Sequence, residues 1–386
     1  MTRITHLNPR RQHWRQLLAV LSLACLSWST QAADIVVGQV APLSGVLAST
    51  GKDMVLGAKI YFDHINATGG INGNQLKHIV LDDGYKVDET LRLTEELIEK
   101  HKAVALIGLA GTANVGEVLK RGLLEKGKLA LVAPYTGGEN LRTASNRNIF
   151  HIRAGYADEA EHMVDHLVTL GVKHIAVFYQ NDGFGEAGKK GVEKALDKRG
   201  LKLAASATYE RNTDEVSTAV ATIRKSEAGA VIMISVNRST AAFAKAYREI
   251  GGSAQLLNIS VVDAGQLVKL SGAPAVHGLG ISQVMPFPYS ETLPVTREFR
   301  KLFAKYAPAD ARISYTNFEE FIGAKVLVEA IRRSGNTPSP EKILQSLETL
   351  GNHDFGGFTI NFSPENRIGS RFVEVTVIAR NGKLLR

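Results

Sequence analysis

The chain has 386 residues, of which 22% are charged and 44% are hydrophobic, and its formal net charge is +8. This composition is typical of a folded globular protein and excludes a disordered or largely membrane-embedded chain. The length predicts two domains rather than one small core.

The first 32 residues have the pattern of a secretory signal peptide. Four arginines and no acidic residue precede an apolar run from Leu17 to Leu26, which is too short for a membrane span. The small residues Thr30 and Ala32 predict cleavage after Ala32. Loss of the four arginines lowers the formal charge from +8 to +4. The remaining basic residues are scattered, so nucleic acid is not a predicted partner.

Two other interpretations of the leader match less well. A lipoprotein site would use Cys25, the only cysteine, but Ser22 stands where leucine is usual. Arg10-Arg11 begins like a twin-arginine signal, but His13-Trp14 does not continue that motif. We therefore expect a chain exported to the periplasm, without a disulfide after cleavage and without a membrane span.

From Asp34 onward, short apolar runs alternate with helical patterns. The runs are apolar at nearly every position, which predicts strands buried on both faces, as in a parallel sheet. Between two of them, Val115, Val118, Leu119, Gly122 and Leu123 share one face of a predicted helix. The alternation predicts a doubly wound α/β fold in two similar halves. The apolar runs cover 35–37, 103–107, 129–132, 175–178 and 230–234.

The pattern changes after Gly280. Helical patterns cover 295–306, 318–333 and 341–350, and strand-like alternation covers 358–360 and 372–377. We expect the late helices to return to the first half. No Gly/Ser-rich or Pro-rich linker separates the halves, which predicts short, hinge-like connections. The predicted domains are a signal peptide at 1–32, a first lobe at 33–152 plus 283–357, and a second lobe at 153–282 plus 358–386.

Several short motifs follow one another in a fixed order. They include Pro42-Leu43-Ser44-Gly45 after the first strand, 65–73 with its glycines, Leu81-Asp82-Asp83, and Phe150-His151-Ile152-Arg153. Together they resemble the leucine/isoleucine/valine-binding protein family of ATP-driven importers, over nearly the whole chain after Asp34. The resemblance implies a type I periplasmic-binding fold, with two doubly wound α/β lobes that are joined by three crossovers and close on a ligand.

The candidate site lies in the loops beyond the carboxyl ends of the strands, where open α/β sheets bind ligands. Hydroxyl groups near a helix start suit a carboxylate, and the resemblance matches Thr112 and Thr136 to the family's carboxylate-binding positions. The alternative for Thr112 is a helix cap alone, and for the aromatic candidates it is core packing. The candidate ligand-binding residues are Ser44, Ala110, Gly111, Thr112, Tyr135, Thr136, Tyr156, Asp182, Phe184, Asn237, Ser260 and Asp263.

Two positions depart from the family pattern. Members often carry a cysteine pair in the first lobe, where this chain has Tyr85 and Ala110. In amino-acid-binding relatives an acidic residue neutralises the ligand's ammonium, and that position corresponds to Ser260. A buried ammonium without a carboxylate is costly. Either Asp263 or Asp182 takes that place, or the ligand lacks an α-amino group.

The sequence gives little indication of dinucleotide binding, metal binding or enzymatic activity. The segment Gly183–Gly188 spells the glycine pattern of dinucleotide folds, but Gln180-Asn181-Asp182 separates it from the strand. The acid that should end the next strand about 20 residues further on is also missing, since Glu210 lies 27 residues beyond Gly183. The histidines show no metal-ligand spacing, so we expect no cofactor, no metal and no enzymatic activity. The sequence predicts a monomeric receptor that carries an amino acid or small carboxylate to the membrane permease of an ABC importer. The alternative is a ligand-sensing subunit that presents a small carboxylate or amide to a chemoreceptor or another signalling partner.

Overall fold

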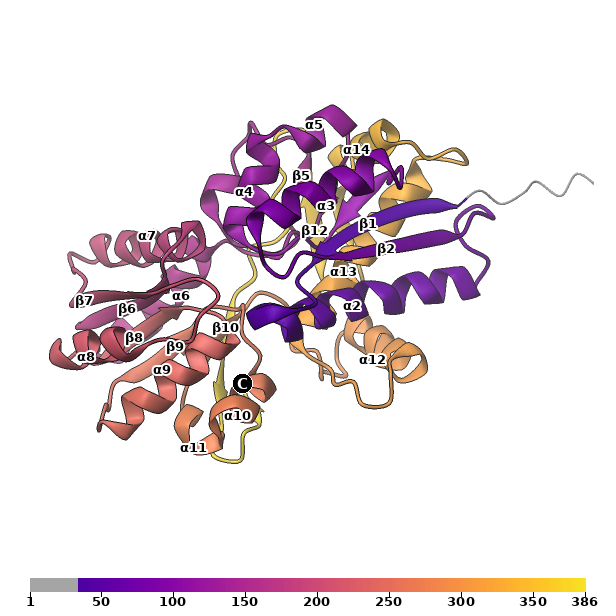
Figure 1. Cartoon of the computed structure of the whole chain (residues 1–386). Helices are drawn as coiled ribbons and strands as arrows, with labels where there is room; N and C mark the ends of the chain where they lie inside the picture. Colours follow the sequence, from indigo (N-terminus) through magenta and orange to yellow (C-terminus); the bar gives the residue numbers. More distant parts are fainter. Residues whose placement is uncertain (1–33) are drawn as a thin grey trace, which may run out of the picture. The chain divides into compact units, whose positions relative to one another are not determined.

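The computed structural model describes residues 34–386, and Ile35–Arg386 form one compact unit. The predicted signal peptide, with its cleavage site and Cys25, lies outside the described residues. Within the described part, no helix combines the length and apolar character that a membrane span requires. Two large sheets, each covered by helices, organise this unit (Figure 1).

The first sheet consists of five parallel strands. They are β1 (Ile35–Ala41), β2 (Leu76–Asp82), β3 (Ala105–Ile107), β4 (Leu131–Val132) and β5 (Ile149–Phe150). Their order is β2-β1-β3-β4-β5. Because side chains alternate along a strand, Ala105 and Ile107 join the core on one face while Leu106 joins the core on the other.

Helices cover both faces of this sheet. One face packs on α2 (Ala48–Ala67), α12 (Pro294–Tyr306), α13 (Tyr315–Arg333) and α14 (Pro340–Glu348). The other packs on α3 (Val87–Glu99), α4 (Thr112–Lys120) and α5 (Leu123–Gly127). Gly57 lets α2 and α13 approach closely, because a Cβ there would lie 2.0 Å from the carbonyl oxygen of Asn317. The late helices therefore share a core with the start of the chain.

The second sheet repeats the plan of the first. Its strands are β6 (Ile175–Gln180), β7 (Ala205–Tyr209), β8 (Ala230–Ile234), β9 (Gln255–Asn258), β10 (Gly280–Gln283), β13 (Glu374–Ile378) and β14 (Leu384–Leu385). The order is β14-β13-β10-β9-β8-β6-β7, with β6 to β10 parallel and the last two antiparallel. In both sheets the first strand lies between the second and the third. The predicted doubly wound α/β fold is confirmed.

Helices also cover both faces of the second sheet. The helices α6 (Tyr156–Thr169) and α7 (Gly183–Asp197) share one core with Val177 and Ile232. The opposite core contains Phe178 and Val231 together with α8 (Ser217–Lys225), α9 (Asn237–Glu249), α10 (Ala264–Ser271) and α11 (Ala273–Val276). The strands predicted from continuous apolar runs are thus the buried central strands of each sheet.

Three connections join the two sheets. They are the segments from β5 to α6, from β10 to α12, and from residue 363 to β13. Before the third, β11 (Gly351–Asp354) and β12 (Thr359–Phe362) form an antiparallel hairpin, and Phe362 packs on Phe150 with ring centroids 5.2 Å apart. The predicted boundary at residue 357 falls inside this hairpin, so we propose 363–373 as the third crossover.

The predicted helix through Val115 and Leu123 is wrong as a single element. Helix α4 ends at Lys120 and α5 begins at Leu123, because Gly122 adopts a left-handed φ of 63° that interrupts helical geometry. Val115, Val118 and Leu123 nevertheless belong to one core. The apolar pattern identified the buried face but not the break.

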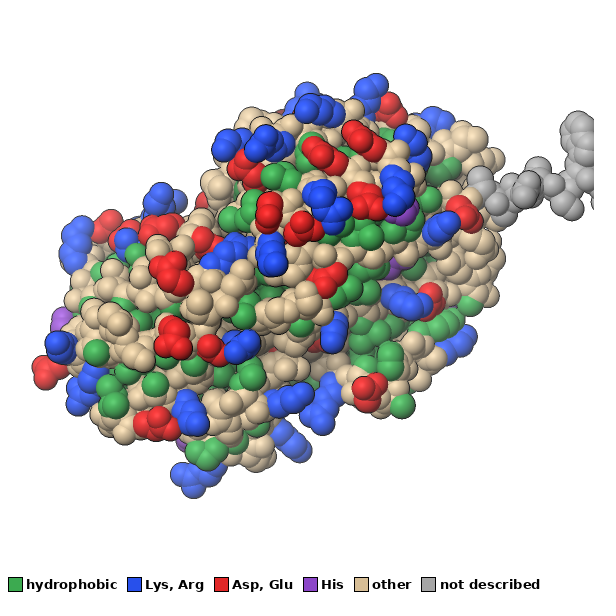
Figure 2. Space-filling model, viewed as in Figure 1, with side chains coloured by type: hydrophobic (Ala, Val, Ile, Leu, Met, Phe, Trp, Pro, Cys, Tyr) green, Lys and Arg blue, Asp and Glu red, His purple; other side chains and the backbone are tan. Residues whose placement is uncertain are grey.

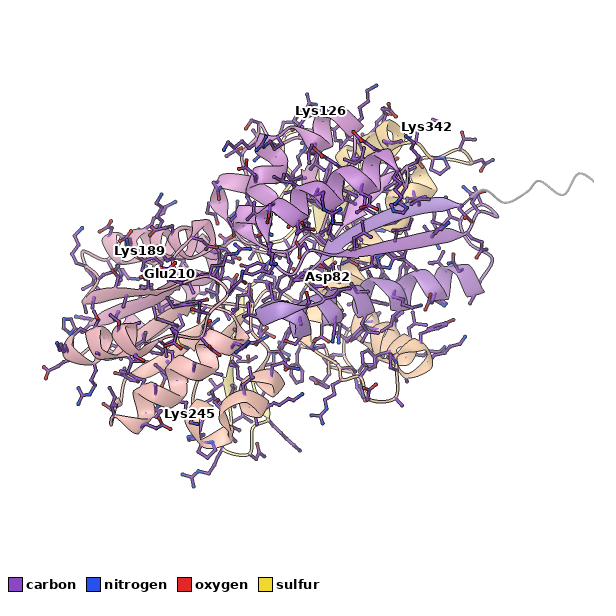
Figure 3. The ribbon with its side chains drawn as sticks, in the orientation of Figure 1. Asp82, Lys126, Lys189, Glu210, Lys245 and Lys342 are labelled. Atoms are coloured by element: carbon purple, nitrogen blue, oxygen red, sulfur yellow. The ribbon has the colours of Figure 1, made fainter. Side chains whose placement is uncertain are left out.

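The surface carries interspersed charges. Basic and acidic side chains alternate over the face shown in Figure 2. Lys126, Lys189, Lys245 and Lys342 project from helices, whereas Asp82 lies at the end of β2 (Figure 3). On this face most basic side chains have acidic ones near them, although the lower edge carries more basic than acidic side chains.

Candidate ligand-binding cleft

A cavity of about 20 Å³ lies where the loops that follow the strands of the two sheets meet. Each sheet contributes four of the lining residues. Those from the first sheet follow its first four strands, and those from the second follow β6, β8 and β9 or open α6. The lining consists of Leu47, Tyr85, Gly111, Tyr135, Tyr156, Phe184, Val236 and Val261.

This position agrees with the rule for open α/β sheets. The strand order reverses between β1 and β3 in one sheet and between β6 and β8 in the other, and ligands bind at such switch points. Leu47 and Gly111 follow the first pair of strands, and Phe184 and Val236 follow the second. The cavity holds about one water molecule, so a larger ligand requires its lining residues to move apart.

Two threonine hydroxyls meet beside the cavity. Thr112 Oγ1 lies 2.7 Å from Thr136 Oγ1, which also accepts a hydrogen bond from the Gly138 N–H at 3.2 Å. Thr112 is the first residue of α4, and the N-cap is Gly111, with a φ of 98° and no side-chain cap. The first N–H groups of a helix lack intrahelical acceptors. The hydroxyl pair and these N–H groups together suit a carboxylate.

The tyrosines of the lining expose ring surface to the cavity while two of their hydroxyls bond elsewhere. Tyr135 Oη lies 3.1 Å from Thr316 Oγ1, and Tyr85 Oη accepts from Gln180 Nε2 at 3.3 Å. Tyr156 meets Phe184 edge to face with ring centroids 5.5 Å apart. Burial raises the pKa of each of the three tyrosines. Half of the lining residues are therefore aromatic, and none carries a charge.

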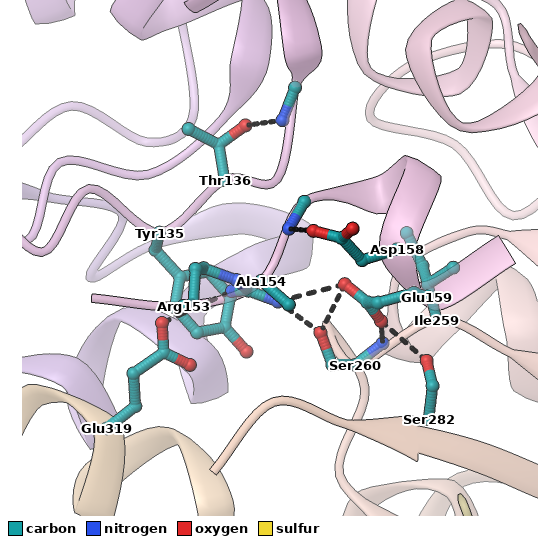
Figure 4. A network of polar contacts seen from close by, with 12 residues as sticks. Tyr135, Thr136, Arg153, Ala154, Asp158, Glu159, Ile259, Ser260, Ser282 and Glu319 are labelled. Atoms are coloured by element: carbon teal, nitrogen blue, oxygen red, sulfur yellow. Dashed lines mark hydrogen bonds and ion pairs between the residues drawn. The ribbon is translucent and has the colours of Figure 1, made fainter. Parts of the chain in front are cut away.

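A buried arginine adjoins this aromatic lining (Figure 4). Arg153 is fully buried, and its Cζ lies 5.0 Å from the ring centroid of Tyr135. Its two Nη atoms lie 3.5 Å from Glu159 Oε1 and 3.4 Å from Glu319 Oε1. Burial disfavours the charge, but the carboxylates of Glu319 and Glu159 outweigh it and raise the pKa of Arg153. Arg153 thus joins α6 of the second half to α13 of the first.

Ser260 belongs to the same network. Arg153 donates to its hydroxyl, which donates in turn to Glu159 Oε1 at 3.0 Å. The Ser260 N–H and the Ser282 hydroxyl both donate to Glu159 Oε2, at 2.8 and 2.5 Å. Burial raises the pKa of Glu319 to about 7, against the opposing charge of Arg153. Ser260, which the family resemblance matches to an acidic position, is therefore engaged with Glu159 and is not among the residues that line the cavity.

A second arginine crosses between the two halves. Arg211 follows β7 and pairs with Asp182 Oδ2 at 2.8 Å. It also donates to the Tyr85 carbonyl and to Asn114 Oδ1, both at 2.7 Å, and its Cζ lies 3.6 Å from the Tyr85 ring centroid. Tyr85 and Asn114 belong to the first half, so this guanidinium links the two halves beside the cavity.

The predicted site residues separate into two groups. Gly111, Tyr135, Tyr156 and Phe184 line the cavity, and Thr112 and Thr136 follow two of them directly in the chain. The others are engaged elsewhere. Ser44 is exposed and donates its N–H to Asp82, and Ala110 pairs with Tyr135. Asp182 caps α7 and Asp263 caps α10. Asn237 donates to Thr50 and accepts from the Asp263 N–H, and Ser260 donates to Glu159.

Seven residues of the cleft are not among the predicted site residues. They are Leu47, Tyr85, Val236 and Val261 in the lining, and Arg153, Glu159 and Arg211 in the polar network. Tyr85 and Arg211 each follow the end of a strand by two or three residues. Their place at the carboxyl edge of a sheet was a signal that could have found them. Arg153 is the last residue of the motif 150–153, one of the motifs on which the family resemblance rests.

The glycine-rich segment 183–188 has a packing role. A Cβ on Gly185 would lie 1.8 Å from the carbonyl oxygen of Gln180, and one on Gly188 would lie 2.5 Å from Ile234 Cγ2. These glycines let α7 approach β6 and β8 closely. Among residues 34–386, no group of three or more His, Cys, Asp or Glu side chains is arranged to hold a metal ion.

Comparison with known proteins gives a consistent result. The family model described as "Periplasmic binding protein" matches residues 34–383. The crystal structure of a substrate-binding periplasmic protein from Ralstonia solanacearum superimposes with a TM-score of 0.87 and 38% identity, covering 91% of this chain and 99% of that chain.

Two curated relatives are similar in sequence. The "Leu/Ile/Val-binding protein homolog 7" of Brucella abortus (strain 2308) is 25% identical, covering 91% of each chain. The "Amino acid binding protein" of Pseudomonas aeruginosa is 26% identical, covering 67% of this chain and 69% of the relative.

Proposed function

Because the chain belongs to the periplasmic binding protein family, we propose that it is the extracytoplasmic solute-binding receptor of an ABC importer. It captures a small amino acid or a related carboxylate between its two lobes and catalyses no reaction. The closed form is what the membrane permease recognises. The family resemblance inferred from the sequence motifs is confirmed.

One observation carries this proposal. Four residues from each sheet enclose a single cavity at the two switch points, beside a pair of threonine hydroxyls. A ligand there would contact both halves at once, so its binding would stabilise their closed arrangement. The names of the two curated relatives, both binding proteins for amino acids, support the choice of ligand class.

A thermal-shift screen of the mature chain tests the proposal. The panel contains amino acids, their amides, and aliphatic and aromatic carboxylates. A ligand at 100 times its dissociation constant should add about 2.7 kcal/mol to the free energy of unfolding. A panel in which no compound raises the melting temperature would contradict the proposed receptor function.

The same proposal places the chain in the periplasm. The leader should direct export and be removed after Ala32. Mass spectrometry of the periplasmic fraction should then find Ala33 at the amino terminus. A full-length cytoplasmic chain would contradict export, and a lipid on Cys25 would replace the soluble form with a lipoprotein.

A further inference from the structure

Building on the proposed function, we infer that the ligand is a carboxylate with an apolar body and no ammonium group. The inference concerns which charges the cleft can accept. An ammonium buried in the cleft needs an acceptor with free lone pairs, preferably a carboxylate. The carboxylates near the cleft decide the question. One of them, Glu319, has no hydrogen-bond partner for its Oε1 among the described residues, but that oxygen lies 3.4 Å from Arg153 Nη1, so its charge is already balanced.

Glu159 has no capacity left for a ligand. An ionised carboxylate offers about four lone-pair positions. The N–H and hydroxyl of Ser260, the hydroxyl of Ser282 and the guanidinium of Arg153 take up four contacts, two on each oxygen. An ammonium could reach Glu159 only by displacing groups that are themselves buried.

Asp182 is engaged in the same way. Its Oδ1 accepts from the Phe184 and Gly185 N–H groups at 2.9 and 3.3 Å, which cap α7. Its Oδ2 accepts from Gln180 Nε2 at 2.7 Å and from Arg211 at 2.8 Å. Of the two acids predicted to replace the one missing at Ser260, Asp182 is therefore excluded and only Asp263 remains.

Asp263 is not among the residues that line the cavity, although Val261 and Val236 close to it are. Its Oδ1 accepts from the Gln266 N–H at 2.9 Å and so caps α10. Burial raises its pKa, which disfavours the charged form that an ammonium would need. The described cavity lining itself contains four aromatic rings and no carboxylate.

The surroundings of the cavity favour an anion instead. The hydroxyls of Thr112 and Thr136 and the first turn of α4 offer donors on the side of the first sheet. Two arginines flank the lining, one behind Tyr135 and one over Tyr85. The Nε of Arg153 is buried and has no hydrogen-bond partner among the described residues. A carboxylate with an apolar body matches both the donors and the rings.

Titration calorimetry of the mature chain with two matched pairs tests the inference. The pairs are phenylalanine with 3-phenylpropanoate and leucine with 4-methylpentanoate, which differ by the ammonium group alone. Each deaminated acid should bind at least about tenfold tighter than its amino acid. An amino acid that binds as tightly as its partner, or more tightly, would overturn the inference.

The outcomes also separate this inference from the receptor function. If none of the four compounds binds while a panel solute that carries an ammonium group or lacks a carboxylate does, the ligand class is wrong and the receptor function stands. Binding of another carboxylate without an ammonium group would support the ligand class. If no compound binds at all, both fail. The variant Asp263→Asn should keep the preference for the deaminated acids. A selective loss of amino-acid binding in that variant would identify Asp263 as an ammonium partner and overturn the inference.

Discussion

Thr112 and Thr136 bring their hydroxyl oxygens within 2.7 Å at the start of α4, although 24 residues separate them in the chain. A carboxylate at this point would gain charge-assisted hydrogen bonds worth about 1.5–3 kcal/mol each. Thr112→Ala and Thr136→Ala should therefore each weaken ligand binding by about tenfold to a hundredfold in calorimetry. Thr222→Ala, on the exposed face of α8, is the matched control. Undiminished affinity in both site variants would place the ligand elsewhere.

Asp53 on α2 gives stability a pH dependence of its own. Burial raises its pKa from 3.8 to about 7, although the Ser314 hydroxyl donates to it at 2.8 Å and lowers that value, while Asp263 adds to the increase. The folded chain thus binds this proton more tightly than the unfolded chain. The contribution of Asp53 to stability is therefore largest below pH 4 and is lost as the pH rises to about 7.

The variant Asp53→Asn should remove that loss. Relative to it, the wild type should lose at most about 1.4 kcal/mol of unfolding free energy per pH unit between pH 4 and 7. Urea unfolding at several pH values measures the difference. Asp310→Asn, which changes an exposed aspartate, is the control. Parallel profiles of the wild type and Asp53→Asn would show that Asp53 does not carry the effect.

At the scale of elements, the sequence predicted the strands and helices that a local pattern of apolar residues determines. Continuous apolar runs identified the strands because both faces of a parallel sheet are buried, and β8 was predicted residue for residue. The break between α4 and α5 at Gly122 was not predicted, because the apolar periodicity continues across it. The roles of Arg153 and Arg211 were not predicted, because their partners are distant in the chain. Ser260 lies 107 residues from Arg153, and Tyr85 lies 126 residues from Arg211. Polar networks of this kind depend on how the topology brings distant segments together, and the periodicity of apolar residues gives no information on that.

The packing of α7 on the second sheet tests the role of its glycines. Gly185→Ala should destabilise the protein by about 1–3 kcal/mol, because the new Cβ would overlap the carbonyl oxygen of Gln180 at 1.8 Å. Gly183→Ala is the matched control in the same helix, since nothing lies within 4 Å of its Cβ position. Chemical denaturation compares the two. Equal stability of both variants would contradict the close approach of α7 to β6.

At the scale of the whole molecule, the two halves meet through the apolar residues around the cavity and through polar contacts beside three crossovers. Arg153 links α6 to α13 at the first crossover, and Asn237 donates to Thr50 of α2 at 3.3 Å. Arg211 makes two hydrogen bonds and a ring contact to the first half. Since a short hinge opposes opening little, these contacts set how often the halves separate.

Arg211→Ala should therefore shift the ligand-free protein toward an open form. Each lost charge-assisted hydrogen bond is worth about 1.5–3 kcal/mol, and 1.4 kcal/mol changes a population ratio tenfold. Small-angle scattering should give a larger radius of gyration for the ligand-free variant than for the wild type, and saturating ligand should reduce it. Arg238→Ala is the control, because its ion pair with Asp214 stays within the second half. Identical ligand-free curves for Arg211→Ala and the wild type would show that Arg211 does not hold the halves together.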